Sequence, residues 1–273
     1  MLNKLCFRVI GLSMNKTIAL SALSIIVAIF LAFHIPAEAQ DQKVVGYWQF
    51  EEGGGQEVED SSGMGNHGEI VGDCEWVDGK FKLGLHFNGE INAYVRLPNE
   101  QISESLLSAN ALTMAAWLKP KHFKADAIAI INDPGNYFLR VVPQFAVNPG
   151  VHIGGWKEVR TDIEPRPEVE KWYHVAGTYD GETLLAYLNG ELTDSFLEPK
   201  FNGDAGAPLQ AGGELVLGSF GDTLFGSGVM DEVLIANYAF TEGELNNLME
   251  SGISAVEPAG KLSTTWSRIK AGY

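Results

Sequence analysis

Residues 171–192 constrain the fold of this chain more than any other stretch. They read KWYHVAGTYDGETLLAYLNGEL and contain two apolar, aromatic-rich runs, 172–179 and 183–188. Each run is followed by a dipeptide, Asp180-Gly181 or Asn189-Gly190, that favours the positive φ values of tight hairpin turns. The order strand, turn, strand, turn, strand predicts two consecutive hairpins in an antiparallel sheet. Because so apolar a sheet needs a second layer to cover it, we predict a β-sandwich.

The same stretch carries a family resemblance. W-x-H-V-A-G-T-Y-D-G followed by L-x-x-Y-L-N-G-x-L resembles the signature of laminin-G-like, concanavalin A-like jelly-roll domains. Three further blocks fit that family in the right order: GYWQFEEGGGQEVEDSSGMGNHG at 46–68, GLHFNGEINAYVRLP at 84–98 and GVMDEVLIANYAFTEGELNNLMESG at 228–252. The resemblance covers 44–252 and implies an all-β, two-sheet antiparallel jelly-roll sandwich with one short C-terminal helix. It does not choose a function, because this fold hosts lectins, enzymes and adhesion modules.

The first 39 residues differ in composition from the rest. Basic residues precede an apolar run at 18–33, and Ala37-Glu38-Ala39 supplies the small residues of a cleavage site. This order predicts a secretory signal peptide over 1–39, and so a secreted, cell-surface or periplasmic mature protein without a stable membrane span. A retained signal anchor is the alternative, because the run is close to the shortest that spans a bilayer.

Charge and cysteine content narrow the class of protein. The formal net charge is −16, and it becomes −18 without residues 1–39, which carry three basic residues and one acidic residue. Nucleic acid is therefore excluded as a partner, since binding it requires a basic face. Cys74 is the only cysteine after residue 39, so the mature chain has no intrachain disulfide and depends on its core, helped by any metal it binds.

Regular elements are expected on both sides of an irregular middle region. From 123 to 167 five prolines interrupt the pattern, and we expect short strand pieces and variable loops that carry binding specificity. After the last strand, Thr241 and Glu244 form a capping box that begins a short helix. Its buried face is predicted to contain Leu245, Leu248 and Met249. The basic tail 253–273 is either a loosely docked extension or a sorting or partner-binding peptide.

No catalytic residue is predicted. Retaining glycosidases on this fold use closely spaced acids on one strand, E-x-D-x-E or E-x-D-x-x-E, because two carboxylates must flank the glycosidic bond. No Glu-x-Asp occurs in the chain. His174, in the hairpin signature, is interpreted as a hydrogen-bonded core residue.

A calcium site has support from residue chemistry and from the resemblance. Calcium takes six to eight oxygen ligands, and Asp60 and Asn66 lie in a glycine-rich loop that can supply them. The family resemblance implies a structural calcium between this loop and the D-E-V segment of the last strand, which places Asp231 at the ion and Gly89 as a carbonyl donor. The alternative is that Asp60 makes an Asx-turn and Asp231 a surface pair.

Ligand binding is assigned to the irregular region. Trp156 follows Gly154-Gly155, outside the strand patterns that place Trp48, Trp117 and Trp172 in the core. An exposed indole can lie against the C–H face of a sugar ring, and Tyr137 and Arg140 are the nearest candidates to join it, although their sharing one surface is left open. We predict an exported, non-catalytic recognition module that binds carbohydrate or an extracellular protein and is stabilised by calcium. The alternatives are a glycoside hydrolase-like enzyme on the same fold and a structural surface protein.

Overall fold

The computed structural model describes residues 43–89, 93–97, 111–121, 127–133, 137–141, 147–152, 155–159, 168–197, 214–220, 224–225 and 227–252. The contacts divide the chain into two units, Met1–Asp41 and Gln42–Tyr273, and every described residue lies in the second. The predicted signal peptide and the tail 253–273 lie outside the described residues. Among the described elements no helix combines the length and the apolar character needed to cross a bilayer.

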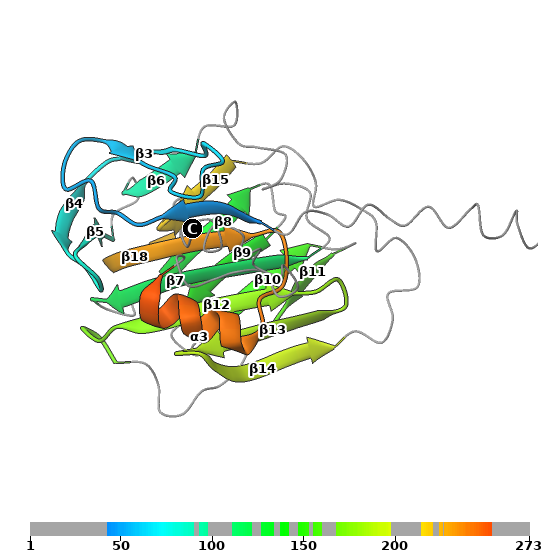
Figure 1. Ribbon diagram of the computed structural model, residues 1–273. Helices are drawn as coiled ribbons and strands as arrows, with labels where there is room; N and C mark the ends of the chain where they lie inside the picture. The colour runs from blue at the N-terminus through cyan, green and yellow to red at the C-terminus, as the bar shows by residue number, and fades with distance from the viewer. Residues whose placement is uncertain are drawn as a thin grey trace, which may run out of the picture. The chain divides into compact units, whose positions relative to one another are not determined.

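Two antiparallel sheets and a short hairpin make up the described domain (Figure 1). In spatial order the first sheet, sheet A, contains β14 (Glu191–Leu197), β13 (Thr183–Leu188), β12 (Tyr173–Tyr179), β7 (Leu112–Pro120), β18 (Ser227–Ala236), β5 (Leu83–Asn88) and β4 (Cys74–Asp78), with β1 (Val44–Trp48) paired to β18. Sheet B contains β11 (Trp156–Glu158), β10 (Asn148–His152), β9 (Tyr137–Val141), β8 (Ala127–Asp133), β15 (Glu214–Leu217), β6 (Tyr94–Leu97), β3 (Gly68–Val71) and β2 (Glu57–Val58). The hairpin is β16 (Ser219–Phe220) with β17 (Leu224–Phe225). The predicted two-sheet sandwich is confirmed.

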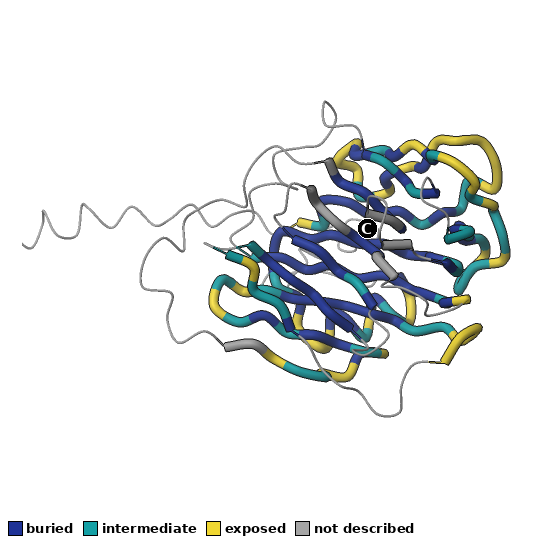
Figure 2. The backbone as a smooth tube through the Cα atoms, turned by 180° about the vertical axis from the view of Figure 1, so that it is seen from behind, coloured by how far each residue is buried: buried dark blue, intermediate teal, exposed yellow. Residues whose placement is uncertain are grey.

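Apolar side chains from both sheets form one core between the layers. Trp48, Leu85 and Met114 from sheet A and Val95, Leu139 and Leu215 from sheet B belong to the same buried cluster. Figure 2 shows the strands of both layers as largely buried backbone, with exposed residues concentrated in turns. Alternate residues of each strand point into this core, as the period of two requires, so the intervening residues form the two outer faces.

One helix, α3 (Glu242–Ser251), covers part of the outer face of sheet A. Leu245 and Leu248 pack against Tyr47 and Leu234 of that face. The predicted capping box is present: the Thr241 hydroxyl accepts from the Glu244 N–H, and the Glu244 carboxylate accepts from the Thr241 N–H. Met249, predicted to be buried with the two leucines, is only half-buried.

The two predicted hairpin turns differ in their outcome. Asn189 and Gly190 have φ values of 52° and 80°, so this turn forms where the sequence predicts it. At the other turn only Gly181 has a positive φ, and the Asp180 carboxylate accepts the backbone N–H groups of Glu182 and Thr183. The turn is therefore centred one residue later than predicted, because Asp180 lies directly after β12 and acts through its side chain.

The middle region is more regular than the sequence predicts. Strands β8 to β11 lie in it, and Pro149 is a residue of β10, which pairs with β9 on one side and β11 on the other. Pro149 packs against Gly177 of the opposite sheet, where an added Cβ would lie 2.4 Å from the proline Cβ. This close approach holds β10 in place despite the missing N–H group.

Candidate functional site

The outer face of sheet B carries an aromatic and charged cluster at its β11 edge. The pairing register places His152 opposite Trp156, Phe138 opposite Gly150, and Arg140 opposite Asn148. We name this surface the Trp156 face; it consists of Phe138, Arg140, His152, Trp156 and Glu158.

Trp156 is the exposed member of this face, with 44% of its surface accessible. Its ring centroid lies 5.0 Å from that of Phe138, at 48°, and 5.4 Å from that of His152, at 82°. Such tilted and edge-on contacts are the favourable geometries for aromatic pairs. The indole is therefore held by two rings while much of it remains open to solvent.

Gly150 makes room for the ring beneath. A Cβ added at Gly150 would lie 2.3 Å from Phe138 Cζ, so the Phe138 ring rests directly on the backbone of β10. Any larger residue at 150 would push Phe138 outward and displace Trp156 with it.

Arg140 and Glu158 form the charged part of the Trp156 face. Arg140 Nη2 lies 3.1 Å from Glu158 Oε2, and both side chains are about one-fifth exposed, at 21% each. Arg140 also donates from Nε to the Asn148 amide oxygen, and its guanidinium lies 4.6 Å from the centre of the Phe138 ring. Asn148 in turn donates to the carbonyl of Val159. Three partners thus fix the guanidinium beside the aromatic rings.

Tyr137 does not belong to this face. It is fully buried, within the core between the sheets. Tyr137 and Arg140 are three positions apart on one strand, and an odd spacing places two side chains on opposite faces. Burial raises the pKa of the Tyr137 phenol above its usual value. Of the three candidates from sequence, the structure therefore brings together Trp156 and Arg140 only.

Phe138, His152 and Glu158 are members of the Trp156 face that were not predicted from the sequence. Their signal was present as spacing: 138 with 140, and 156 with 158, are pairs separated by two that share a strand face. The prolines of this region argued against regular strands. A spacing of two residues indicates a shared face only when both residues lie on one strand.

Asp60 and Asn66, two of the predicted calcium ligands, lie together in one hydrogen-bond network. Asp60 Oδ1 accepts the N–H groups of Tyr47 and Ser62, each at 2.9 Å, and Oδ2 accepts the Asn66 N–H at 2.8 Å. The Asn66 amide donates to the Val45 carbonyl. Both carboxylate oxygens of Asp60 thus organise the loop, as in the Asx-turn alternative.

Strand β1 separates this loop from the last strand. Tyr47 accepts from the Ser61 N–H through its carbonyl and donates to Asp60 through its own N–H. Both backbone groups therefore face the loop, whereas the opposite edge of β1 pairs with β18, with Tyr47 opposite Leu234. Asp60 consequently lies beyond β1 as seen from β18.

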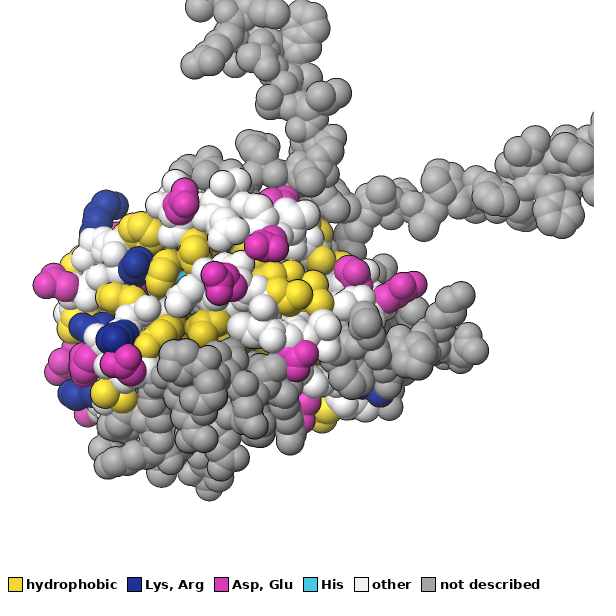
Figure 3. Space-filling model, turned by 90° about the horizontal axis from the view of Figure 1, so that it is seen from below, with side chains coloured by type: hydrophobic (Ala, Val, Ile, Leu, Met, Phe, Trp, Pro, Cys, Tyr) yellow, Lys and Arg dark blue, Asp and Glu magenta, His cyan; other side chains and the backbone are white. Residues whose placement is uncertain are grey.

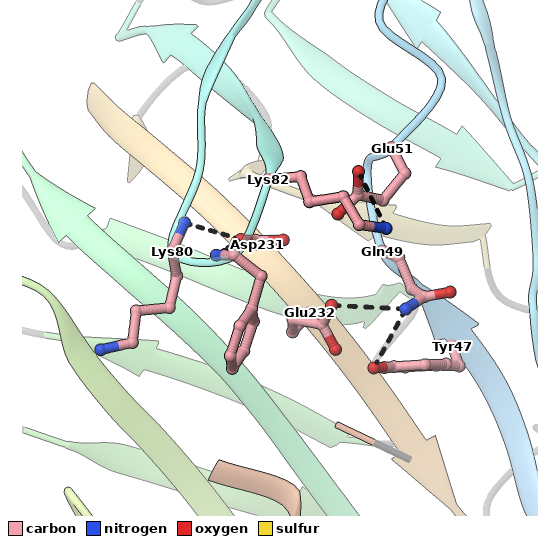
Figure 4. Close-up of polar contacts among 8 residues, drawn as sticks. Tyr47, Gln49, Glu51, Lys80, Lys82, Asp231 and Glu232 are labelled. Carbon is pink, nitrogen blue, oxygen red and sulfur yellow. Dashed lines mark hydrogen bonds and ion pairs between the residues drawn. The ribbon is translucent and has the colours of Figure 1, made fainter. Parts of the chain in front are cut away.

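Asp231 belongs to a different cluster, on the outer face of sheet A (Figure 4). Its Oδ2 accepts the backbone N–H groups of Lys80, at 2.7 Å, and Phe81, at 3.0 Å. Its Oδ1 is buried without a hydrogen-bond partner. Burial is the main cause that raises the pKa of Asp231 to about 6, and the charge of Glu51 adds to it.

A bulge puts the next acid on the same face. The register of β18 shifts between Asp231 and Leu234, and Glu232 has a φ of 52°. Glu232 Oε1 accepts from Gln49 Nε2 at 3.4 Å, while its Oε2 is buried without a partner. Burial raises the pKa of Glu232 to about 7. Two consecutive acidic residues are therefore buried on the same face of the sheet.

Trp117 and His174 continue this row across sheet A. Asp231 is opposite Trp117, and Trp117 is opposite His174, with their rings 5.3 Å apart. Lys80 Nζ lies 3.9 Å from the centre of the Trp117 ring. Trp117 Nε1 and His174 Nδ1 are buried without hydrogen-bond partners. His174 is therefore buried, as predicted, but it lies on the outer face of sheet A and its ring is not fully hydrogen-bonded. Burial, helped by Lys80, lowers the pKa of His174 to about 3.

Gly89 lies at a third place. It has a φ of 79° and packs beside Ser227, to which an added Cβ would approach within 2.7 Å. Ser227 precedes Asp231 by four strand residues, which corresponds to roughly 13 Å along β18. The four predicted calcium ligands thus occupy three separate places, and the described part of the chain holds no group of three or more His, Cys, Asp or Glu side chains suited to a metal.

A single calcium ligand set around all four residues does not fit this geometry. Asp231 keeps one buried carboxylate oxygen, Oδ1, without a hydrogen-bond partner. Glu51 is the acid whose charge acts on Asp231, and it is paired with Lys82 at 3.8 Å (Figure 4).

The surface charge agrees with the acidic composition. Figure 3 shows acidic side chains scattered over the face seen from below, with most of the visible basic side chains at one side. No continuous basic surface crosses this view.

Comparison with known proteins places the fold. Residues 88–246 match the sequence profile of the concanavalin A-like lectin/glucanase superfamily. A similar solved structure is domain 4 of AbnA, an extracellular GH43 arabinanase of Geobacillus stearothermophilus, in complex with arabinotriose; it shows 22% identity and a TM-score of 0.61, over 77% of this chain and 99% of that domain.

Toxin binding domains are also similar in structure. The binding domain of Paraclostridial Mosquitocidal Protein 1 shows 16% identity and a TM-score of 0.60, over 77% of this chain and 52% of that one. The binding domain of botulinum neurotoxin serotype G shows 13% identity and a TM-score of 0.59, over 76% of this chain and 50% of that one. The chain thus spans about half the length of these toxin domains. A comparison with curated protein sequences gives no significant match. At these identities the solved structures establish the fold.

Proposed function

Because this chain belongs to the concanavalin A-like lectin/glucanase superfamily, we propose that it is an exported, non-catalytic recognition module that binds carbohydrate through the Trp156 face. The similarity to an arabinanase domain whose structure contains arabinotriose supports carbohydrate as the ligand class. The similarity to toxin binding domains, one of them in complex with rat synaptotagmin II, makes an extracellular protein the competing outcome of the tests below.

The observation that carries the proposal is the exposed Trp156 ring beside a fixed Arg140–Glu158 pair. An indole presents a large apolar face, against which the C–H groups of a sugar ring pack. The sugar hydroxyls then need polar partners at the edge of that face, and a guanidinium and a carboxylate provide donors and acceptors that make strong hydrogen bonds. Few precisely placed polar groups around an apolar surface are typical of ligand sites.

The absence of catalysis is part of the proposal. A glycosidase needs one acid with a raised pKa that touches the substrate. Among the described acids, those with raised pKa values are Asp231 and Glu232. Both residues are buried on the outer face of sheet A, so neither carboxylate is exposed to a substrate. The sequence also lacks the Glu-x-Asp spacing of the glycosidases on this fold.

We also propose a structural calcium at Asp231, in a narrower form than the sequence predicts. Asp231 Oδ1 would be its carboxylate ligand, and Glu51 is the acidic side chain that can turn to it from its partner Lys82. Calcium would supply positive charge to a buried carboxylate whose ionised form is destabilised by burial. Asp60 and Asn66 have the role of loop organisers in this proposal, and Gly89 has no part in the ion site.

A titration tests the carbohydrate proposal. The mature chain, residues 40–273, is titrated with arabinotriose and with xylo- and gluco-oligosaccharides, while intrinsic tryptophan fluorescence and calorimetry report binding. We expect binding that Trp156→Ala removes and that the control Leu192→Ala leaves unchanged, because Leu192 is an equally exposed apolar residue, at 52%, on β14 of the other sheet. Binding that survives in Trp156→Ala would remove the Trp156 face from the function, and binding of a secreted protein in place of every saccharide would favour the competing ligand class.

A further inference from the structure

We infer that the ligand of the Trp156 face is a neutral saccharide, and that Glu158 selects it by accepting hydrogen bonds from the sugar's hydroxyls. This inference rests on the proposed function and adds the charge class of the ligand and a specificity-determining residue.

The first step is the position of Glu158. Trp156 and Glu158 are two residues apart on β11 and so project from the same face, about 7 Å apart along the strand. A sugar ring stacked on the indole would therefore have the carboxylate of Glu158 within reach of a hydroxyl at its edge. Glu158 is about one-fifth exposed, so its side chain is accessible to a ligand while being fixed by the protein.

The positive charge of Arg140 is balanced within the site. Its guanidinium is held at once by Glu158, by the Asn148 amide oxygen and by the Phe138 ring. An arginine waiting for an anionic ligand needs a charge that is not already balanced, whereas this one is neutralised within the site. Arg140 is therefore a positioning residue for Glu158.

The third step is the field around the site. A carboxylate or sulfate on the ligand would approach Glu158, and like charges that meet in a partly desolvated site repel strongly. The chain as a whole has a formal net charge of −16, which lowers the encounter rate of anionic ligands. Hydroxyl groups, in contrast, donate to the Glu158 carboxylate without any charge penalty.

Matched sugar pairs test the inference. Methyl glucoside with methyl glucuronide, and methyl galactoside with methyl galacturonide, differ only in the group at C6, and NMR titration of the mature chain measures their dissociation constants. We expect the neutral member of at least one pair to bind more tightly by roughly tenfold or more, the size of a hydrogen bond to a charged group. Glu158→Gln should weaken the neutral sugar and narrow the preference, because the variant loses the carboxylate that repels an anionic ligand and the ion pair with Arg140.

Two further variants keep the result interpretable. Glu158→Asp retains the charge but withdraws the carboxylate by one methylene, so it should weaken the neutral sugar without improving the uronide. Glu191→Gln, at an exposed acid of β14, is the control and should change neither constant.

The outcomes separate the two proposals. If no saccharide binds, or if binding does not depend on Trp156, the proposed function fails and this inference fails with it. If binding depends on Trp156 but the uronides bind as well as the neutral sugars, or Glu158→Gln changes neither constant, the module remains a saccharide binder and the selection by Glu158 is wrong.

Discussion

The outer faces of the two sheets each carry a tryptophan, and the two differ in solvent exposure. On sheet A, Trp117 is 7% exposed and has the ammonium of Lys80 over its ring. On sheet B, Trp156 is 44% exposed, and two other rings support it from its sides. One indole is sealed by its own chain, and the other is presented to solvent. The difference supports the proposal that Trp156 belongs to a ligand surface, whereas Trp117 is part of the fold.

Polar groups follow the same division. On the outer face of sheet A, the residues Trp117, His174, Asp231 and Glu232 form what we call the sealed face. Each of them has a buried side-chain nitrogen or oxygen without a hydrogen-bond partner, and such atoms lower the stability of the fold. On the Trp156 face, in contrast, the charged side chains of Arg140 and Glu158 form an ion pair near the surface. We therefore expect pH and cations to change stability through the sealed face, and ligands to bind the Trp156 face. The following predictions test this division in order of decreasing effect.

Trp117→Ala should have the largest effect. Removing a buried indole leaves a cavity and exposes the polar row around Asp231, so we expect a loss of about 3–5 kcal/mol in the free energy of unfolding. Urea denaturation measures it, with Trp117→Phe as a control that keeps an aromatic ring under Lys80. Saccharide binding to the fraction that remains folded should not change; a binding defect in a folded Trp117→Phe variant would show that the two faces are coupled.

Calcium should stabilise the folded protein by binding at the sealed face. An ion that binds only the native state contributes about 2.7 kcal/mol at a hundredfold excess over its dissociation constant. For a domain of this size each kcal/mol raises the melting temperature by roughly 2–4 °C, so calcium should add about 5–10 °C relative to chelator. Asp231→Asn should remove this difference, whereas Asp60→Asn should lower the melting temperature equally with and without calcium.

Equal melting temperatures of the unmodified protein in excess calcium and in chelator, with no ion retained from purification, would contradict the calcium proposal. A calcium effect lost in Asp60→Asn but kept in Asp231→Asn would move the ion to the other cluster.

Protonation of His174 should destabilise the folded protein as the pH falls, with a sign opposite to that of Asp231 and Glu232, whose raised pKa values make protonation favour the folded state. The pKa of His174 is lowered to about 3 in the folded protein, below an unfolded value near 6.5. A group with a lowered pKa that is neutral when folded contributes stability above pH 6.5 and loses it as the pH falls toward 3. At pH 5 the loss corresponds to about 2 kcal/mol.

His174→Phe keeps a ring against Trp117 but cannot be protonated. Denaturation of this variant and of the unmodified protein, both in chelator, should give similar stabilities at pH 8 and a relative gain for the variant at pH 5. A difference between the two proteins that does not vary with pH would mean that His174 is not the group that titrates.

Trp156→Ala should have the smallest effect on stability. Because its ring is nearly half exposed, we expect a change within about 1 kcal/mol in the free energy of unfolding, although saccharide binding is lost. Thermal unfolding without ligand measures it. A stability loss as large as that of Trp117→Ala would mean that the Trp156 face is a structural surface and would remove the distinction between the two tryptophans.

Local sequence chemistry was sufficient wherever neighbouring residues decide the conformation. The Asn189-Gly190 turn formed as predicted because those residues tolerate positive φ, and the Thr241–Glu244 capping box formed because its partners are three residues apart. The two hairpins and their apolar surface were enough to predict a two-layer sandwich. At Asp180 even local reasoning was off by one residue, since a side-chain hydrogen bond replaced a backbone turn position.

Only the tertiary structure decided the composition of the sites. Tyr137 and Phe138 are both aromatic neighbours of Arg140 in sequence, and the phase of β9 against the core sent the first inward and the second outward. The bulge at Asp231 and Glu232 turned two consecutive acids to one face, against the usual alternation of a strand. Strand β1 came to lie between Asp60 and β18, which separated Asp60 and Asn66 from Asp231 in the predicted ligand set. Residue types specify which chemistry a chain can offer, but strand phase and register depend on packing between distant segments, and those long-range contacts determine which residues share a site.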